Sequence, residues 1–322
     1  MIFAPVSMVT SLSSNVFEIF FIYRFNTRRL LSIVATIFPS TSRMSVCQLV
    51  QRFERAIKSR NEVLTKLISK EISLQIPKLR PVDLVNISKI YSPLAPAILS
   101  ECRDRKFAKF KSQDFTILAE IAKDDQIYID SISARVDMFR TCDLCYVLWK
   151  VADPQVRQRG LEEMKNRDLS TLSFTNFTQL LKVVCSESSR PIAPKLLSNL
   201  IRELSTRISS VDSKTLPFIL YCISETVSKN GTTIIDEHFV HFFTLVNSQL
   251  STRTDIKPLD FVDCVRALGR IRQLEKKLFE EKFIKEVLPF LKPSDLDNVR
   301  LKGLENAAAT VGYNNSFKLV VS

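Results

Sequence analysis

The segment LSFTNFTQLLKVV, residues 172–184, decides the fold, because six further segments of the chain align with it without gaps. The seven segments start 29 to 45 residues apart, about 35 on average. This spacing is typical of helical-hairpin repeats. The other six are LRPVDLVNISKIY (79–91), FKSQDFTILAEIA (110–122), FRTCDLCYVLWKV (139–151), VDSKTLPFILYCI (211–223), IKPLDFVDCVRAL (256–268) and LKPSDLDNVRLKG (291–303).

The columns of this alignment predict the start of a helix in each segment. The first and sixth positions are apolar in every segment, as Leu172 and Phe177 are, and they form a hydrophobic staple if the second position is the N-cap. The fifth position then lies in the first helical turn, where a carboxylate can accept a backbone N–H and oppose the positive end of the helix dipole. Its occupants are mostly acidic: Asp83, Asp114, Asp143, Asn176, Thr215, Asp260 and Asp295.

The residues that follow each start continue one helical face. Leu144, Val147, Leu148 and Val151 show the i, i+3, i+4, i+7 spacing of a buried stripe. The intervening stretches predict second helices at 194–205, 234–250 and 275–291, and residues 48–76 predict an opening helix or helix pair. Helix pairs that cannot bury their apolar faces alone stack on their neighbours. We therefore predict an all-α fold, an α-solenoid of about seven helical hairpins that occupies 45–312 without an internal boundary, with a C-terminal tail at 313–322.

Residues 1–44 have the composition of an organelle-targeting leader. The apolar runs 16–23 and 30–38 are each shorter than the ~18 residues that a membrane span needs. The region carries four arginines, one acid and many Ser and Thr, which is typical of a transit peptide. We expect import into a mitochondrion, with a plastid-type organelle as the alternative, and no membrane span in the mature chain. A flexible apolar tail, or a true start at Met44, is the competing interpretation.

The repeat columns and the repeat length resemble those of organellar RNA-metabolism proteins of the heptatricopeptide and octotricopeptide classes. The resemblance covers roughly 79–303. It implies import into mitochondria or plastids, and either binding to organelle transcripts or a fixed place in a ribosome there. Some members carry a C-terminal RAP domain. No segment after 303 is long enough for one, so a nuclease-like role is not implied.

Positive charge gathers in the N-terminal third of the chain. The whole chain has 46 basic and 34 acidic residues, a net charge of +12, of which 45–112 carries +8 and 113–322 only +1. Such a basic region favours an anionic partner such as RNA, bound through its phosphates. The candidate RNA-binding residues form two groups along the chain. The first basic group is Arg52, Arg55, Lys58 and Arg60, and the second basic group is Arg103, Arg105, Lys106, Lys109 and Lys111.

Two aromatic residues, Phe107 and Phe110, are interleaved with the second basic group. Aromatic rings beside cations can stack bases while the cations contact the backbone of a single strand. Alternatively, both rings face the core and the cations are simply solvated. No polar column persists from segment to segment, so a strict base-reading code is not expected.

The sequence lacks the features of an enzyme. Only 5 glycines occur, and neither a GxGxxG nor a GxxxxGK[ST] motif is present, which argues against nucleotide-binding folds. His238 and His241 could share a metal, but a zinc site usually needs three or four ligands. The single pair Cys142 and Cys145 has no second pair to complete such a site, and it is interpreted as structural.

These observations predict a non-catalytic protein without a cofactor or a metal. Its expected partners are RNA, either ribosomal RNA or an organellar transcript, and other proteins of a large assembly. The alternative is a structural accessory subunit of a mitochondrial complex with protein contacts only. The near-neutral 113–322 favours that alternative.

Overall fold

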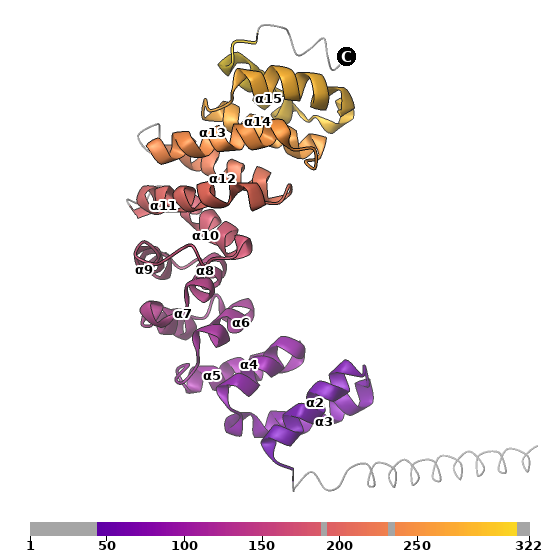
Figure 1. The fold of residues 1–322 in the computed structure, drawn as a ribbon. Helices are drawn as coiled ribbons and strands as arrows, with labels where there is room; N and C mark the ends of the chain where they lie inside the picture. Colours follow the sequence, from indigo (N-terminus) through magenta and orange to yellow (C-terminus); the bar gives the residue numbers. More distant parts are fainter. Residues whose placement is uncertain (1–43, 188–191, 231–235, 314–322) are drawn as a thin grey trace, which may run out of the picture. The chain divides into compact units, whose positions relative to one another are not determined.

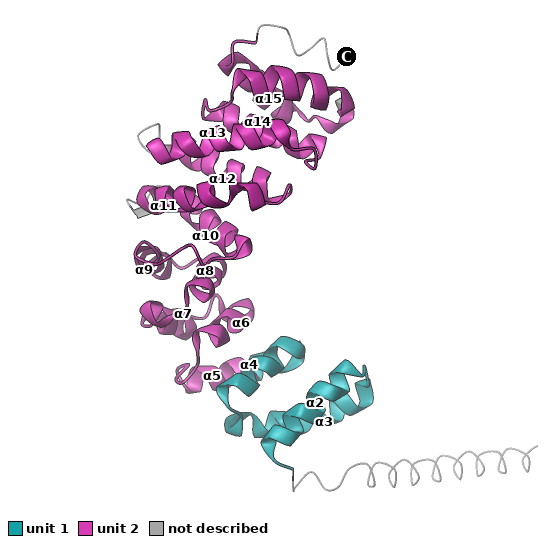
Figure 2. Cartoon of the chain, in the orientation of Figure 1, with its two compact units in different colours: residues 1–97 teal, residues 98–322 magenta. Residues whose placement is uncertain are grey.

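The computed structural model describes residues 44–187, 192–230 and 236–313, and every regular element within these ranges is helical (Figure 1). The all-α prediction is therefore confirmed for this part of the chain. The expected leader, apart from Met44, and nearly all of the expected C-terminal tail lie outside the described residues. The packing divides the chain into two compact units, residues 1–97 and 98–322, so a division falls inside the segment that was predicted to be one domain (Figure 2).

The described part of unit 1 contains three complete α-helices and the first residues of α5 (Ala95–Asp104). α2 (Val46–Lys58) and α3 (Glu62–Gln75) form the predicted opening pair, and α4 (Pro81–Ile90) packs against α2. Ser45 begins α2 with a reciprocal cap, since its hydroxyl accepts the Gln48 N–H while its own N–H reaches the Gln48 side chain. Phe53 is fully buried against Tyr91, with ring centroids 5.2 Å apart. The short 3₁₀ turns η2 (Ile76–Lys78) and η3 (Ser92–Leu94) flank α4.

Unit 2 is built from two rows of helices that can be followed in Figure 1. In the first row α6, α8, α10, α12, α14 and α15 each pack against the next, and in the second row α7, α9, α11 and α13 do the same. The first row spans α6 (Ser112–Ala122), α8 (Thr141–Lys150), α10 (Phe174–Ser186), α12 (Thr215–Asn230), α14 (Pro258–Arg270) and α15 (Asn298–Thr310). The second row spans α7 (Gln126–Ser133), α9 (Pro154–Met164), α11 (Ile192–Arg207) and α13 (Glu237–Thr252), and α5 (Ala95–Asp104) precedes both rows.

The predicted staples explain where the first-row helices begin. All seven sixth-column residues are buried, and five of the seven first-column residues are buried with them. The second column is the N-cap, as expected, of α4, α6, α8, α10 and α14. The apolar stripe Leu144, Val147, Leu148 and Val151 is completely buried. Each aligned segment up to 256–268 therefore begins a helix and buries one face of it.

The last aligned segment and the stretch before it differ from the prediction. Pro293 begins only a single 3₁₀ turn, η9 (Pro293–Asp295), and the expected helix start there is wrong. α15 begins at Asn298 instead, because the Asp297 carboxylate accepts the Arg300 N–H at 2.7 Å and provides a new cap. The helix expected at 275–291 is a π-helix, η7 (Leu278–Val287), followed by the 3₁₀ turn η8 (Leu288–Phe290).

Among the residues that the structure describes, none of the helices has both the length and the apolar character required to cross a bilayer.

Candidate nucleic-acid interface

The second basic group lies mainly in the loop between α5 and α6, and an uncommon backbone shapes this loop. Lys106, Phe107 and Lys109 have positive φ angles of 50°, 50° and 64°. Such angles are unfavourable for residues other than glycine and persist only where the surroundings hold them. Here the Phe107 N–H donates to the Cys102 carbonyl at 3.0 Å, and the Phe107 side chain is fully buried. Lys106 and Lys109 remain exposed on either side of this anchor.

The two phenylalanines of the loop belong to the core. The Phe107 ring lies 5.7 Å from Phe110, 6.0 Å from Phe115 and 5.4 Å from Tyr128, measured between ring centroids. Phe110 is also buried. Neither ring has a free face for a base, so the stacking interpretation is wrong and the alternative, that both rings face the core, is confirmed.

Two of the five cations in this group are held by neighbouring acids. Arg103 forms an ion pair with Asp125, and Arg105 pairs with Glu101 at 2.6 Å. The Arg105 side chain is 24% exposed, so most of it is withdrawn from solvent. Lys106, Lys109 and Lys111 are all exposed, and no acid among the described residues lies within ion-pair distance of their ammonium groups. The three lysines are therefore the part of this group that is available to an anionic ligand.

The first basic group lies in unit 1, on α2 and the turn that follows it. Arg52 is half-buried and donates to the Met44 sulfur at 3.6 Å. Arg55, Lys58 and Arg60 are exposed. Arg55 and Lys58 occupy the last turn of α2, where positive charge is stabilised by the helix dipole. Four candidates thus belong to unit 1 and five to unit 2.

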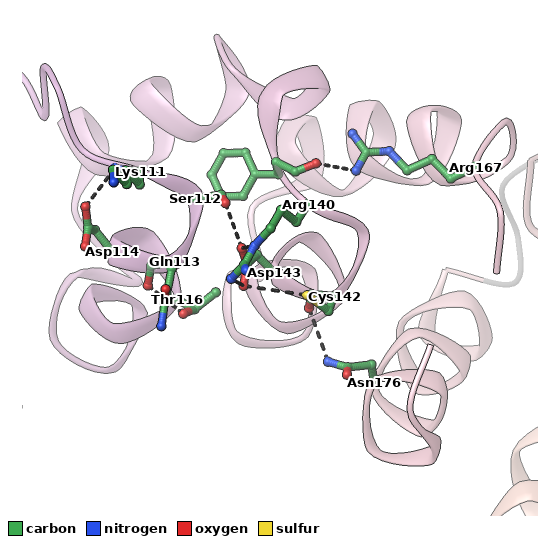
Figure 3. A network of polar contacts seen from close by, with 11 residues as sticks. Lys111, Ser112, Gln113, Asp114, Thr116, Arg140, Cys142, Asp143, Arg167 and Asn176 are labelled. Atoms are coloured by element: carbon green, nitrogen blue, oxygen red, sulfur yellow. Dashed lines mark hydrogen bonds and ion pairs between the residues drawn. The ribbon is translucent and has the colours of Figure 1, made fainter. Parts of the chain in front are cut away.

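Polar side chains join the amino-terminal ends of α6, α8 and α10 (Figure 3). The buried Asp114 accepts the Lys111 N–H at 2.7 Å, as predicted for the fifth column. Asp143 is bound differently, because both of its oxygens are held by the Arg140 guanidinium at 2.7 and 3.1 Å, and it also accepts the Ser112 hydroxyl. The Asn176 amide donates to the Cys142 carbonyl at 3.2 Å. These contacts connect neighbouring helices. They also pair the Arg140 guanidinium with Asp143, so this cation is not available to a ligand.

One recurring use of arginine has no counterpart among the predictions from the sequence. Four arginines at the ends of second-row helices, or just beyond them, donate to main-chain carbonyls at or near the first column of the preceding aligned segment. The pairs are Arg135 with Phe107, Arg167 with Phe139, Arg207 with Leu172 and Arg253 with Val211. Each arginine stands three to five residues before the next aligned segment, a spacing that could have shown the pattern. These cations are structural.

In the described part of the chain, the cysteine and histidine residues do not gather into a metal-binding cluster. Burial raises the pKa of the Cys145 thiol to about 12, so this group is protonated and unreactive near neutral pH. Both His238 and His241 lie exposed on α13. No group of three or more His, Cys, Asp or Glu residues that could hold a metal occurs among the described residues.

No protein-family model matches the chain, and a search of curated proteins found no significantly similar sequence. The assignment of a function therefore depends on the geometry and charge of the chain itself.

Proposed function

We propose that this protein is a non-catalytic RNA-binding scaffold of an organelle, most simply a component associated with the mitochondrial ribosome or with a transcript. The observation that carries the proposal is the loop of Lys106, Lys109 and Lys111, whose ammonium groups are exposed while the buried Phe107 fixes the backbone between them. Because the backbone of the loop is held in one conformation, binding of phosphates by these lysines loses less conformational entropy than binding by a flexible tail would. Arg55, Lys58 and Arg60 of unit 1 add a second exposed basic group.

The proposed framework for this surface is an α-solenoid of about seven helical hairpins. Its support is the succession of contacts within unit 2, where each first-row helix packs on the next and second-row helices pack in parallel order. The recurrent capping and arginine–carbonyl contacts support the same arrangement. We also propose that the chain belongs with the organellar helical-repeat proteins that its aligned segments resemble, and that it acts in a mitochondrion or, alternatively, a plastid.

Binding through these lysines supplies affinity without reading sequence, because phosphate contacts position a nucleic acid and base contacts specify it. The burial of Phe107 and Phe110 removes the stacking contribution from this loop. Affinity should then depend strongly on salt. For a single strand the slope of log K against log salt is roughly −0.7 per phosphate contact.

The test measures fluorescence anisotropy of labelled oligouridylate with the full chain, between about 50 and 200 mM salt. Replacing Lys106, Lys109 and Lys111 together with Gln should flatten the slope by about 2, the sum of three contacts. The matched control replaces three other exposed lysines, Lys195, Lys214 and Lys285, with the same change in net charge. Equal slopes for the two triple variants would contradict the proposal.

The alternative function is a structural accessory subunit of a mitochondrial protein complex. The near-neutral charge of 113–322 favours it, since a surface with mixed charges suits protein contacts. Purified protein without salt-sensitive affinity for RNA, isolated together with proteins only, would support this alternative. Fusion of residues 1–44 to a fluorescent reporter tests the location separately, and a cytosolic reporter would contradict organelle import.

A further inference from the structure

A groove of about 1420 Å³ lies within unit 2 along α12, α14 and α15. α14 packs against both of the other helices and therefore lies between them. The volume exceeds the ~300–1,000 Å³ that is usual for small-molecule sites. A groove of this size is suited to a segment of a macromolecule.

Two glycines shape the groove. A Cβ atom at Gly269 would lie 2.5 Å from the Ala307 Cβ, so the absence of a side chain lets α15 approach α14 closely. A Cβ atom at Gly303 would lie 2.4 Å from the Arg266 Nε, so the Arg266 side chain lies directly against α15 at this glycine. α14 and α15 thus approach each other closely at Gly269, and the Arg266 side chain lies against α15 and lines the groove.

The charged residues that line the groove are partly paired with one another. Asp263 accepts from Arg266 at 2.8 Å and from Arg300 at 3.2 Å, and Arg270 forms an ion pair with Glu225. Two further lining cations are exposed and have no acid within ion-pair distance among the described residues, namely Arg272 and Lys302. With Asp297 included, five cations and three acids line the groove, which leaves an excess of two positive charges.

Apolar surface accompanies this charge. The exposed fractions of Phe218 and Tyr221 on α12 are 37% and 56%, and that of Val299 on α15 is 68%. Phe218 and Tyr221 are three residues apart and so share one face of their helix. Aromatic residues and arginine are enriched at protein–protein interfaces, where a few such side chains, covered by the partner, contribute most of the binding energy.

We propose that this groove binds a segment of a partner protein that carries about two carboxylates beside apolar side chains. The two carboxylates complement Arg272 and Lys302, and the apolar side chains cover Phe218, Tyr221 and Val299. RNA fits the groove less well, because Glu225, Asp263 and Asp297 would face a continuous chain of phosphates. The inference goes beyond RNA binding by the lysine loop: the protein would hold RNA through one surface and a protein through another.

The experiment selects random dodecapeptides from a display library on the immobilised full chain and measures the affinity of the enriched peptides by fluorescence anisotropy. The expected peptides combine Asp or Glu with Leu, Phe or Trp. The double variant Arg272→Glu, Lys302→Glu should bind them at least about tenfold more weakly, since two attractive charge pairs become repulsive. Tyr221→Ala should weaken binding without changing the preference for acidic residues.

A matched control separates an effect at the groove from an effect of net charge. The double variant Lys195→Glu, Lys285→Glu changes net charge by the same amount at exposed sites outside the groove and should bind the peptides as the parent does. Enriched peptides without a preference for acidic residues, or equal affinity for both double variants, would overturn the proposal. The proposal would also be overturned if oligouridylate competed with the peptides and bound the double variant Arg272→Glu, Lys302→Glu more weakly than the parent, because the groove would then bind RNA. The triple variant of Lys106, Lys109 and Lys111 should leave the peptide affinity unchanged, so the experiments can refute RNA binding and peptide binding independently.

Discussion

Arg167 offers the sharpest test of how neighbouring elements of unit 2 are held together. Its guanidinium donates to the Phe139 carbonyl, to those of Val136 and Asp137 at 3.2 and 3.1 Å, and to Glu163 at 2.9 Å. The side chain is only 13% exposed. The substitution Arg167→Met keeps the apolar stem of the side chain and removes every donor.

The expected loss follows from the carbonyls that would remain. The Asp137 residue is exposed, so its carbonyl can be hydrated, and the buried Val136 carbonyl still accepts the Phe139 N–H at 3.3 Å. The carbonyl of the buried Phe139 is therefore the acceptor that the substitution affects most. A hydrogen bond to a charged group contributes about 1.5–3 kcal/mol, and burial of an acceptor without a partner is unfavourable. One such acceptor, with a smaller loss at Val136, should lower the free energy of unfolding by about 2–3 kcal/mol.

Urea unfolding followed by circular dichroism measures the loss, and hydrogen exchange locates it. Exchange should quicken in α8, α9 and the turn at 136–138 before it does in α14 and α15, because a helix in such rows depends mainly on its neighbours. Arg159→Met is the control, since Arg159 is exposed and its guanidinium donates to the Ser133 hydroxyl at 3.3 Å. If both variants unfold at the same urea concentration, the arginine–carbonyl contacts do not stabilise the fold.

Three further predictions concern packing and charge. Phe177→Ala should cost about 3–5 kcal/mol in denaturant unfolding, because the ring is completely buried; an unchanged midpoint would place this side chain at the surface. Gly269→Ala should cost about 1–3 kcal/mol in thermal unfolding, because the new Cβ would lie 2.7 Å from the Ala307 Cα and backbone must move; an unaltered melting temperature would contradict the close approach of α15. The Arg253 guanidinium, which donates to Asp255, lowers the pKa of that carboxyl to about 2, so this pair should stabilise the fold above the unfolded-state pKa of about 3.9 and lose its effect as the pH falls toward 2. An NMR titration of the Asp255 carboxyl with a midpoint near 3.9 would refute that pairing.

The sequence predicted most of the first-row helices because their starts are local. A staple and a cap involve residues no more than five positions apart, so Leu172 and Phe177 reveal a helix start without knowledge of the rest of the chain. The seventh segment failed for the same local reason. A second capping residue, Asp297, follows the expected start at Pro293 and begins α15 five residues later.

The contacts between elements could not be predicted in the same way. Gly303 interrupts the apolar stripe in the sequence, and only the structure shows Arg266 lying against it. The π-helical winding of η7 likewise has no signal in a pattern whose period cannot separate winding types over ten residues. The groove on α12, α14 and α15 combines the close packing at Gly269 and Gly303 with charged residues from all three helices, so no single segment of the sequence predicts it.

The arginine–carbonyl contacts change how the charge of this chain is interpreted. The basic region 45–112 predicts an anionic partner, whereas Arg135, Arg167, Arg207 and Arg253 of the near-neutral 113–322 direct their guanidinium groups to main-chain oxygens of the same protein. These four add to the net charge of +12 without offering a free donor fork to a phosphate. Lysine cannot replace this fork geometry, but it presents a mobile point charge to solvent. This difference between the structural arginines and the exposed lysines predicts that ligand-binding cations are mainly lysines. Three exposed lysines lie within six residues in the loop before α6.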